Sequence, residues 1–514
     1  ASTALYRNMA GKGFSLWEQK EPYPRSVRDA LSVLLTGGQL LQSFSNHDDG
    51  LAFGDMVVAG QANGTLRQKL AAKAATAGHL AMADVDGDGD LDLFIGARSL
   101  PGNYPKPVDS WIYLNEEGVW KESPAWSAAL QDIGLVTGAV FLNIDAHPLP
   151  DLLLACDWGT PKILVNTGTG FIDRTNQYGL AKFTGFWRGI DAGDFNGDGR
   201  MDFVAANRGL NAGYNASAEK PFVVYHGDLD GDGRREIIET EREDGLIYPR
   251  RNLSTLNSAM PWLAEHLLNY DHYAQFTVEA FSEAARLTKA VRSGITTLQS
   301  MVFLRTDGGF EPIPLPVEAQ LTAAFCPAVA DFDNDGAEDI ALSQNVFGVH
   351  QEESRQDAGF GLLLLGQGDG TFKTTTIGVS GLTVFGEGRA AATADFNHDG
   401  RTDLIICQNG AKPKLFLNQA KRRGLRVQLQ GGKGNREGVG AQIRLELKGK
   451  SGPSRTVRVG SGFLSQNSTT QILGAAENAT ALLVAWPNGK GERYKLAPNQ
   501  SAITAVSGQG EPLD

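Results

Sequence analysis

A nine-residue pattern recurs along this chain, with acidic or amide side chains at positions 1, 3, 5 and 9 and glycine at position 6. Four clear copies begin at Asp84, Asp194, Asp331 and Asp395, and a fifth, which begins at Asp228, ends in Glu. Carboxylates at this density repel one another unless a cation lies among them, and an all-oxygen donor set favours a hard cation. The alternating spacing brings side chains 1, 3 and 5 together around a glycine turn, as in the first half of an EF-hand loop. The pattern therefore predicts about five Ca²⁺ sites.

The predicted ligands are the side chains at positions 1, 3, 5 and 9 of each copy. They are Asp84, Asp86, Asp88, Asp92, Asp194, Asn196, Asp198, Asp202, Asp228, Asp230, Asp232, Glu236, Asp331, Asp333, Asp335, Asp339, Asp395, Asn397, Asp399 and Asp403. An apolar strand, such as Leu93–Ile95, follows the loop where an EF-hand would have a helix. Because Asp-Gly strings also form plain turns, the prediction depends on five copies in register, not on one.

The spacing of the copies predicts a β-propeller. Two eroded copies, which begin at Asn143 and at His47, bring the number of starts to seven. The smallest intervals between copies are long enough for four short strands. A unit of four strands cannot bury its own faces, so such units stack around a common axis. We therefore predict an all-β, seven-bladed propeller in which each loop joins the first and second strands of a blade. The N-terminal stretch, 4–17, is predicted to add an outer strand to the last blade; the alternative is a remnant of an upstream repeat.

A helical insertion is predicted at about 250–295, in the longest interval between copies. Leu256, Met260, Leu263 and Leu267 follow helical spacing, and Ser254 is a candidate N-cap. A second helix is expected from Tyr273 to Leu287. We expect this hairpin to pack on one face of the propeller, either as a structural cap or as a lid or partner-docking arm.

The charge balance divides the chain into two predicted domains, 1–420 and 421–514. Residues 421–514 hold 14 Lys+Arg and 6 Asp+Glu, which is a net charge of +8. Because the whole chain has a net charge of −12, the remaining 420 residues carry −20. The acidic body disfavours nucleic acid as a partner, whereas the basic tail leaves open an acidic protein surface or an anionic polymer. Strand patterns such as Arg426–Gln430 and Ala481–Trp486 predict a small β-sandwich or barrel in the tail.

The motifs resemble a known family. The acidic loops are similar to FG-GAP/VCBS repeats, the calcium-bearing blades of integrin α-like propellers. The tail resembles the ASPIC/UnbV domain through Asn435–Ala441, Val459–Gln466 and Trp486–Gly489. The combination looks like a cartilage acidic protein-like chain of the bacterial type. The resemblance implies a secreted, periplasmic or cell-surface location, bound Ca²⁺, and an adhesion or scaffold role.

Catalytic motifs are absent from the sequence: there is no nucleophile elbow, GxGxxG after a strand, P-loop or HExxH. Three cysteines at wide spacing do not make a disulfide framework, and no apolar run reaches the ~20 residues of a membrane span. We therefore predict a non-catalytic protein, with a protein partner or a larger assembly, no nucleic acid and no membrane span.

Two alternatives stay open. The first is a lectin-like propeller, whose face could be lined by Trp158, Trp187 and Tyr214, with Arg188 and Arg208 nearby. Aromatic side chains on that face could stack on sugar rings. Otherwise these aromatic residues belong to the blade core or rim. A calcium-dependent polysaccharide lyase would need a basic and aromatic cleft beside a cation.

Overall fold

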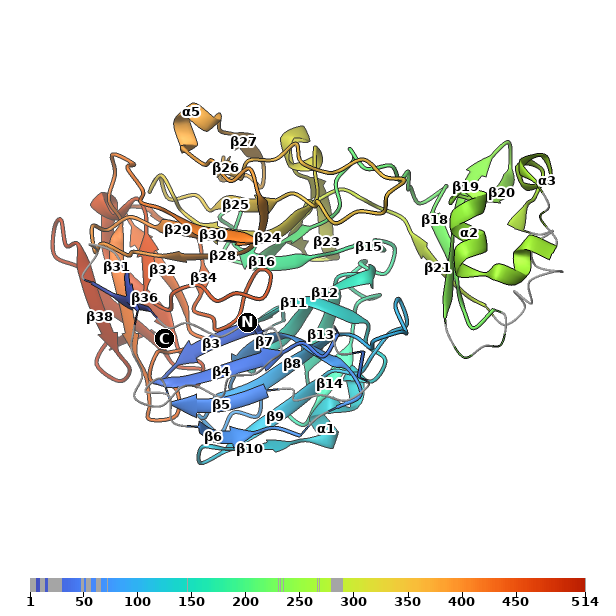
Figure 1. The fold of residues 1–514 in the computed structure, drawn as a ribbon. Coiled ribbons are helices and arrows are strands. Elements are labelled where there is room, and N and C mark those ends of the chain that lie inside the picture. Colours follow the sequence, from blue (N-terminus) through green and yellow to red (C-terminus); the bar gives the residue numbers. More distant parts are fainter. Residues whose placement is uncertain are drawn as a thin grey trace.

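The computed structural model describes most of the chain. The described residues are 6–9, 14–16, 30–47, 50–51, 57–61, 66–71, 73–145, 147–229, 231, 233, 235–265, 267, 269–278 and 290–513. Strands dominate, and the few helices are short (Figure 1).

Six antiparallel sheets follow one another in chain order and form the body. Their strands are β3 (Ala30–Thr36), β4 (Gln39–Phe44), β5 (Val57–Gln61) and β6 (Leu66–Lys69); β7 (Thr76–Ala83), β8 (Asp92–Ser99), β9 (Trp111–Glu116) and β10 (Val119–Glu122); β11 (Leu135–Leu142), β12 (Asp151–Gly159), β13 (Lys162–Asn166) and β14 (Phe171–Asp173), with β15 (Gly185–Phe186) paired to β12; β16 (Gly189–Gly193), β17 (Asp202–Ala206), β22 (Met301–Thr306) and β23 (Gly309–Pro314); β24 (Ala324–Ala330), β25 (Asp339–Gln344), β26 (Leu362–Gly366) and β27 (Phe372–Thr374); and β28 (Glu387–Ala394), β29 (Asp403–Asn409) and β30 (Ala411–Phe416). Short helical turns lie between them: α1 (Pro124–Ser127), η1 (Ala128–Leu130), η4 (Val317–Gln320) and α5 (Ile377–Ser380).

The first strands of successive sheets contact one another, in the order β3, β7, β11, β16, β24 and β28. β7 and β11 are buried along their whole length because both faces of an inner strand are covered by neighbouring sheets. Apolar clusters fill the spaces between sheets: one joins Phe94 and Phe141, and another stacks Phe203 on Phe303 at 4.6 Å. The body is therefore an all-β, propeller-like ring, as predicted.

The predicted assignment of strands around the acidic loops is largely confirmed. The copies at Asp84, Asn143, Asp194, Asp331 and Asp395 each join the first and second strands of a sheet. The eroded copy at His47 was assigned wrongly, since it lies between β4 and β5, the second and third strands. The copy at Asp228 lies outside the ring, so the described residues form six ring sheets and not seven blades.

That copy belongs to a lobe inserted between β17 and β22, which Figure 1 shows in green beside the ring. The lobe has its own sheet, β20-β19-β18-β21, covered by short helices. Its elements are β18 (Phe222–Gly227), β19 (Glu236–Glu243), β20 (Leu246–Pro249), α2 (Leu253–Ala259), η2 (Pro261–Glu265), α3 (Tyr270–Ala274) and β21 (Val291–Ile295). The helical insertion was thus predicted in the right place, but it packs on the sheet of the lobe and not on a face of the propeller.

Two details of the insertion differ from the prediction. Asn252, not Ser254, caps α2 by accepting a hydrogen bond from the Thr255 N–H. The second predicted helix is seen only as α3, and residues 279–287 of that prediction lie outside the described residues.

The prediction for the N-terminus was wrong in its partner. β1 (Tyr6–Asn8) and β2 (Phe14–Leu16) pair with each other as a two-stranded sheet and not with the last ring sheet. The C-terminal segment joins β28 to β3 instead. The Gln466 side chain bonds both the N–H and the C=O of Leu35 at 2.8 and 2.9 Å, and Asn467 Oδ1 accepts from the Thr393 N–H at 3.1 Å.

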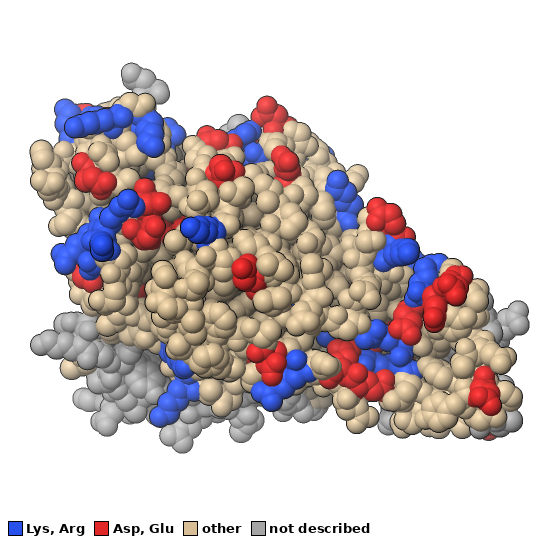
Figure 2. Space-filling view, turned by 90° about the horizontal axis from the view of Figure 1, so that it is seen from above, with Lys and Arg blue, Asp and Glu red and all other residues tan. Residues whose placement is uncertain are grey.

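The C-terminal strands form two further sheets, β35-β31-β38 and one built around β32-β36-β37. Their elements are β31 (Leu425–Gln430), β32 (Gln442–Leu447), β33 (Lys450–Ser451), β34 (Arg455–Thr456), β35 (Gln471–Leu473), η5 (Ala476–Asn478), β36 (Ala479–Ala485), β37 (Gly491–Lys495), β38 (Ala502–Val506) and β39 (Glu511–Pro512). Inward-facing Leu425, Val427, Ile443 and Leu482 share one core between the two sheets. Lys and Arg side chains gather at this end of the molecule, at the left of Figure 2.

Candidate functional site: acidic loops beneath the C-terminal sheets

Two acidic loops gather three carboxylates each. In the loops at Asp84 and Asp331, one oxygen from each of positions 1, 3 and 5 lies within 4.8 Å of the others. Backbone N–H groups hold the position-1 side chain: Gly87 and Gly89 donate to Asp84 at 2.8 and 3.0 Å. Burial raises the pKa of Asp84 to about 6 and that of Asp331 to about 7 when no cation is near. A divalent cation would relieve this cost, so both donor sets fit Ca²⁺.

The position-9 carboxylate has a structural task that the sequence pattern alone did not reveal. Asp92 accepts from the Val85 N–H at 2.9 Å and from the Asn115 N–H at 3.0 Å, so it ties the loop to the third strand. The same two bonds recur at Asp151, Asp202, Asp339 and Asp403. Glu236 makes the first of them, to the Leu229 N–H. Position 9 is therefore a clamp between strands, and only its remaining lone pairs could contact a cation.

The loops at Asp194 and Asp395 carry less free charge. Position 3 is Asn in both, and an arginine at position 7 neutralises position 5: Arg200 forks onto Asp198 Oδ2, and Arg401 bonds Asp399 Oδ2 at 2.8 Å. Asp194 Oδ1 and Asp399 Oδ1 are nevertheless buried without a hydrogen-bond partner. These two orphaned acceptors leave one place each for a cation of weaker affinity.

The two remaining copies differ again. In the copy at Asp228, Asp230 and Asp232 lie outside the described residues, and Asp228 accepts from Gly231 and Gly233 as the other first positions do. In the eroded copy, the Asn143 amide donates to the carbonyls of His147 and Pro148, so a donor points where a cation would sit. Hydrogen bonds hold the described residues of that loop, and positions 1, 3, 5 and 9 offer only two carboxylates, Asp145 and Asp151.

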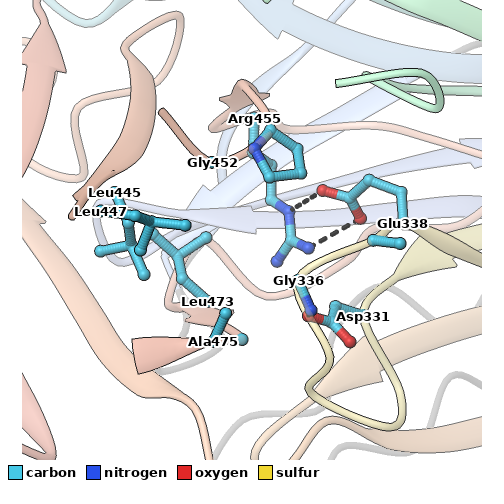
Figure 3. Close-up of a pocket in the computed structure, with 12 residues that line it drawn as sticks. Asp331, Gly336, Glu338, Leu445, Leu447, Gly452, Arg455, Leu473 and Ala475 are labelled. Carbon is cyan, nitrogen blue, oxygen red and sulfur yellow. Dashed lines mark hydrogen bonds and ion pairs between the residues drawn. The ribbon is translucent and has the colours of Figure 1, made fainter. Parts of the chain in front are cut away.

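The C-terminal sheets lie directly against the acidic loops. The Ser454 N–H donates to Asp194 Oδ2 at 2.9 Å, and Arg426 approaches Asp395 at 3.5 Å. Arg455 forms two parallel bonds to Glu338, at 2.8 and 2.7 Å, inside a small pocket that Asp331 and Gly336 also line (Figure 3). Arg455 and Glu338 are both buried, so this ion pair lies inside the contact between the C-terminal sheets and the loop. Basic C-terminal residues thus lie beside acidic ring loops.

The segment 459–467, which we call the plug, enters the ring between the first strands. Its Val459 and Gly462 bridge to Met82 of β7 and Ile190 of β16. The Phe463 and Leu464 N–H groups donate to Cys326 Sγ and to His79 Nδ1. Gly462 has φ +61°, and a Cβ there would lie 2.3 Å from Cys326 Sγ, so only glycine fits. Burial lowers the pKa of His79 to about 4, which keeps this ring neutral in its contact with the plug.

The aromatic candidates separate in the structure. Trp187 is completely buried in the ring core, so it belongs to the blade core and does not line the propeller face. Trp158 is half-buried with φ +55°, and its indole N–H donates to Tyr104 Oη at 2.7 Å. Tyr214 is buried and donates to Glu353 at 2.5 Å. Sequence reasoning missed His79, Glu338 and Glu353, because nothing local marks a residue whose partner lies far along the chain.

The antiparallel sheets lie around an axis, the acidic loops lie on one face, and a second β-unit packs on those loops. This arrangement defines a propeller-type repeat protein with an appended β-domain. The chain carries an FG-GAP-like repeat, matched at residues 143–205, and an ASPIC and UnbV domain, matched at residues 431–512. Both matches agree with the resemblance to FG-GAP repeat proteins that carry a C-terminal UnbV domain. No curated protein matches the sequence.

Among solved structures, the chain aligns with an exotype rhamnogalacturonan lyase at 13% identity, over 95% of this chain and 74% of that one, with a TM-score of 0.29. It aligns with a rhamnogalacturonan lyase of Bacillus licheniformis at 10% identity, over 93% and 90%, with a TM-score of 0.27. The Dos1 propeller aligns at 12% identity, over 93% and 95%, with a TM-score of 0.31. Scores this low establish no shared fold or activity. In the described residues, no helix has the length and apolarity to cross a bilayer.

Proposed function

We propose that this chain is an extracytoplasmic, calcium-binding, non-catalytic protein that binds a protein partner or acts as a scaffold subunit. One observation carries the calcium part: three carboxylates converge within 4.8 Å in each of two loops whose turns are already held by backbone N–H groups. Millimolar extracellular calcium would occupy about half of the sites with a Kd of ~10⁻³ M and most of the sites with a Kd of ~10⁻⁴ M. At these ratios each filled site stabilises the fold by about 0.4–1.4 kcal/mol.

Several reactive side chains are engaged in structural contacts, which supports the non-catalytic part. Cys156 and Cys326 are buried, and burial raises the pKa of both thiols. His79 bonds the Ala139 carbonyl and the plug.

Asp86→Asn tests the calcium sites against a matched control, Asp145→Asn. Both side chains stand at position 3 of a copy and accept from the N–H of position 5, so each amide keeps that bond. We expect Asp86→Asn to weaken calcium binding at its loop, toward the lower affinity of the loops with Asn at position 3, and so to reduce the rise in Tm at limiting calcium, whereas Asp145→Asn changes neither. Elemental analysis and melting with and without EGTA measure this. Equal losses in both variants would overturn the assignment.

Affinity capture from the native source, with and without EGTA, tests the binding role. A stoichiometric protein partner that is lost on chelation supports a calcium-dependent scaffold. Unsaturated, ultraviolet-absorbing products from an acidic polysaccharide would instead overturn the non-catalytic proposal.

A further inference from the structure

A cleft of about 740 Å³ lies between the C-terminal sheets and two acidic loops of the ring. The ring contributes the tips of the loops that begin at Asp194 and Asp331. The C-terminal part contributes the turn between β32 and β33 and residues around η5. Ligand sites in proteins occupy about 300–1,000 Å³, so this cleft has room for a bound molecule.

The C-terminal wall of the cleft is basic. Its cationic side chains are Arg422, Arg444, Lys448 and Lys450. All four are exposed, and none forms an ion pair or a side-chain hydrogen bond within the described residues. Two other arginines of the C-terminal part are instead paired with ring carboxylates, Arg455 with Glu338 and Arg458 with Asp191. The cleft therefore gathers positive charge that the protein leaves unpaired and that a ligand can reach.

Arg444 places a guanidinium group across the cleft from β32. A Cβ built on Gly199, in the loop that begins at Asp194, would lie 3.6 Å from Arg444 Nη1. Asp198 of the same loop already pairs with Arg200 at 2.8 Å. The N–H donors of Arg444 are therefore free for a carboxylate of a ligand.

The opposite wall of the cleft is acidic, since Asp194, Asp198 and Asp335 line it. Without a cation, these carboxylates repel an anionic ligand and offset the basic wall. All three belong to loops that we propose as calcium sites, so a cation in each loop would neutralise this wall. Binding of an anion in the cleft is therefore expected to depend on calcium.

A second cleft, of about 600 Å³, lies on the other side of the loop that begins at Asp194, and Gly199 lines both clefts. It adds Arg200, Arg305 and His147 to the lining. We call the two clefts together the basic groove. Their combined volume exceeds that of a small-molecule site, so the groove suits several units of a polymer.

The lining favours a polysaccharide over a protein segment. Apart from Pro453 and the buried Leu447, the side chains that line the larger cleft are polar or no larger than alanine. A protein interface buries an apolar core, which this cleft does not offer. Carboxylates pair with arginine and also coordinate calcium, so an anionic polymer with carboxylates suits both walls.

We propose that the basic groove binds an acidic polysaccharide whose charges are carboxylates, as in a chain that contains uronic acids. The carboxylates pair with the exposed basic side chains of the C-terminal wall, while calcium neutralises the ring wall. The proposal rests on the proposed calcium binding and goes beyond the scaffold role, because it gives the C-terminal sheets a ligand of their own.

Calorimetric titration of the intact chain with a hyaluronan oligosaccharide, in calcium and in EGTA, tests the groove. The comparison probes are a neutral maltooligosaccharide of the same length and a glutamate peptide of the same charge. We expect the hyaluronan oligosaccharide to bind in calcium, to bind about tenfold more weakly in EGTA, and to lose affinity as the salt concentration rises. The maltooligosaccharide should not bind. No binding in calcium, equal affinity in calcium and EGTA, or tighter binding of the peptide overturns the proposal.

Elemental analysis of the same samples separates two failures. A chain that holds calcium but does not bind the hyaluronan oligosaccharide contradicts this proposal alone. A chain that holds no calcium contradicts the proposed calcium binding as well.

Lys448→Gln combined with Lys450→Gln removes two charges from the groove, and Lys490→Gln combined with Lys495→Gln is the matched control. All four lysines are exposed in the C-terminal part, but neither control residue lines either cleft. Both double variants change the net charge equally. We expect the groove variant to bind the hyaluronan oligosaccharide about fivefold more weakly and to keep its calcium content, whereas the control binds as the wild type does. Equal affinity of the two double variants would show that the polysaccharide does not lie in the groove.

Discussion

At the scale of single residues, the position-9 carboxylate is the most informative feature. Asp339 accepts from the Phe332 N–H at 2.7 Å and from the Gly366 N–H at 2.8 Å, so one side chain joins a loop and two strands. Asp339→Ala leaves both buried donors unpaired and should cost about 2–6 kcal/mol. Denaturant unfolding in EGTA measures this loss without any contribution from calcium. Asp307→Ala, at a fully exposed position, should leave the unfolding midpoint unchanged. Equal stability of Asp339→Ala and wild type would contradict the clamp.

At the scale of elements, the plug depends on a neutral histidine. Because the pKa of His79 falls from 6.5 to about 4 on folding, the unfolded chain binds more protons between these values. The contribution of His79 is therefore complete above pH ~6.5 and is lost as the pH falls toward 4, by about 3 kcal/mol at most. We expect the stability difference between wild type and His79→Gln to shrink over this range in urea unfolding. A difference that is constant with pH would show that His79 does not couple the plug to protons.

At the scale of the whole molecule, the C-terminal sheets and the acidic loops share one interface. Glu338 and Arg455 bond each other there, and Ser454 contacts Asp194. If calcium orders these loops, its removal should loosen the attachment of the C-terminal sheets as well as the loops themselves. We expect EGTA to raise hydrogen exchange in 450–467 while exchange in β14, the outer strand of the sheet that carries the eroded copy at Asn143, stays unchanged. Increased exchange confined to the loops would show that the two parts dock independently of the cation.

Much of the fold could be predicted from the sequence, because its strongest signals are local. The loop pattern predicted strand–loop–strand units, and five of them lie where expected in the ring. The same pattern could not distinguish a ring sheet from an inserted one, so Asp228 was assigned to a blade. The contact that joins the last ring sheet to the first could not be predicted from local patterns either, because Gln466 bonds Leu35 across 431 positions of sequence.

The candidate site was predicted in part. The structure brings Asp84, Asp86 and Asp88 together, and calcium binding stays a prediction. The double role of position 9 was missed because a ligand and a strand clamp require the same residue type at the same spacing.

The inserted lobe leaves and re-enters the ring at adjacent points. The Asn207 N–H donates to Ser300 Oγ at 2.9 Å, and the Asn207 amide bonds the carbonyls of Thr297 and Gln299. These bonds therefore join the chain just after β17 to the chain just before β22, without contacts from the ninety or so residues between them. For protein engineering, this junction is a suitable position at which to replace the lobe with a short linker or with a foreign domain. In evolutionary terms, the same junction allows a ring of fixed geometry to acquire and discard a module.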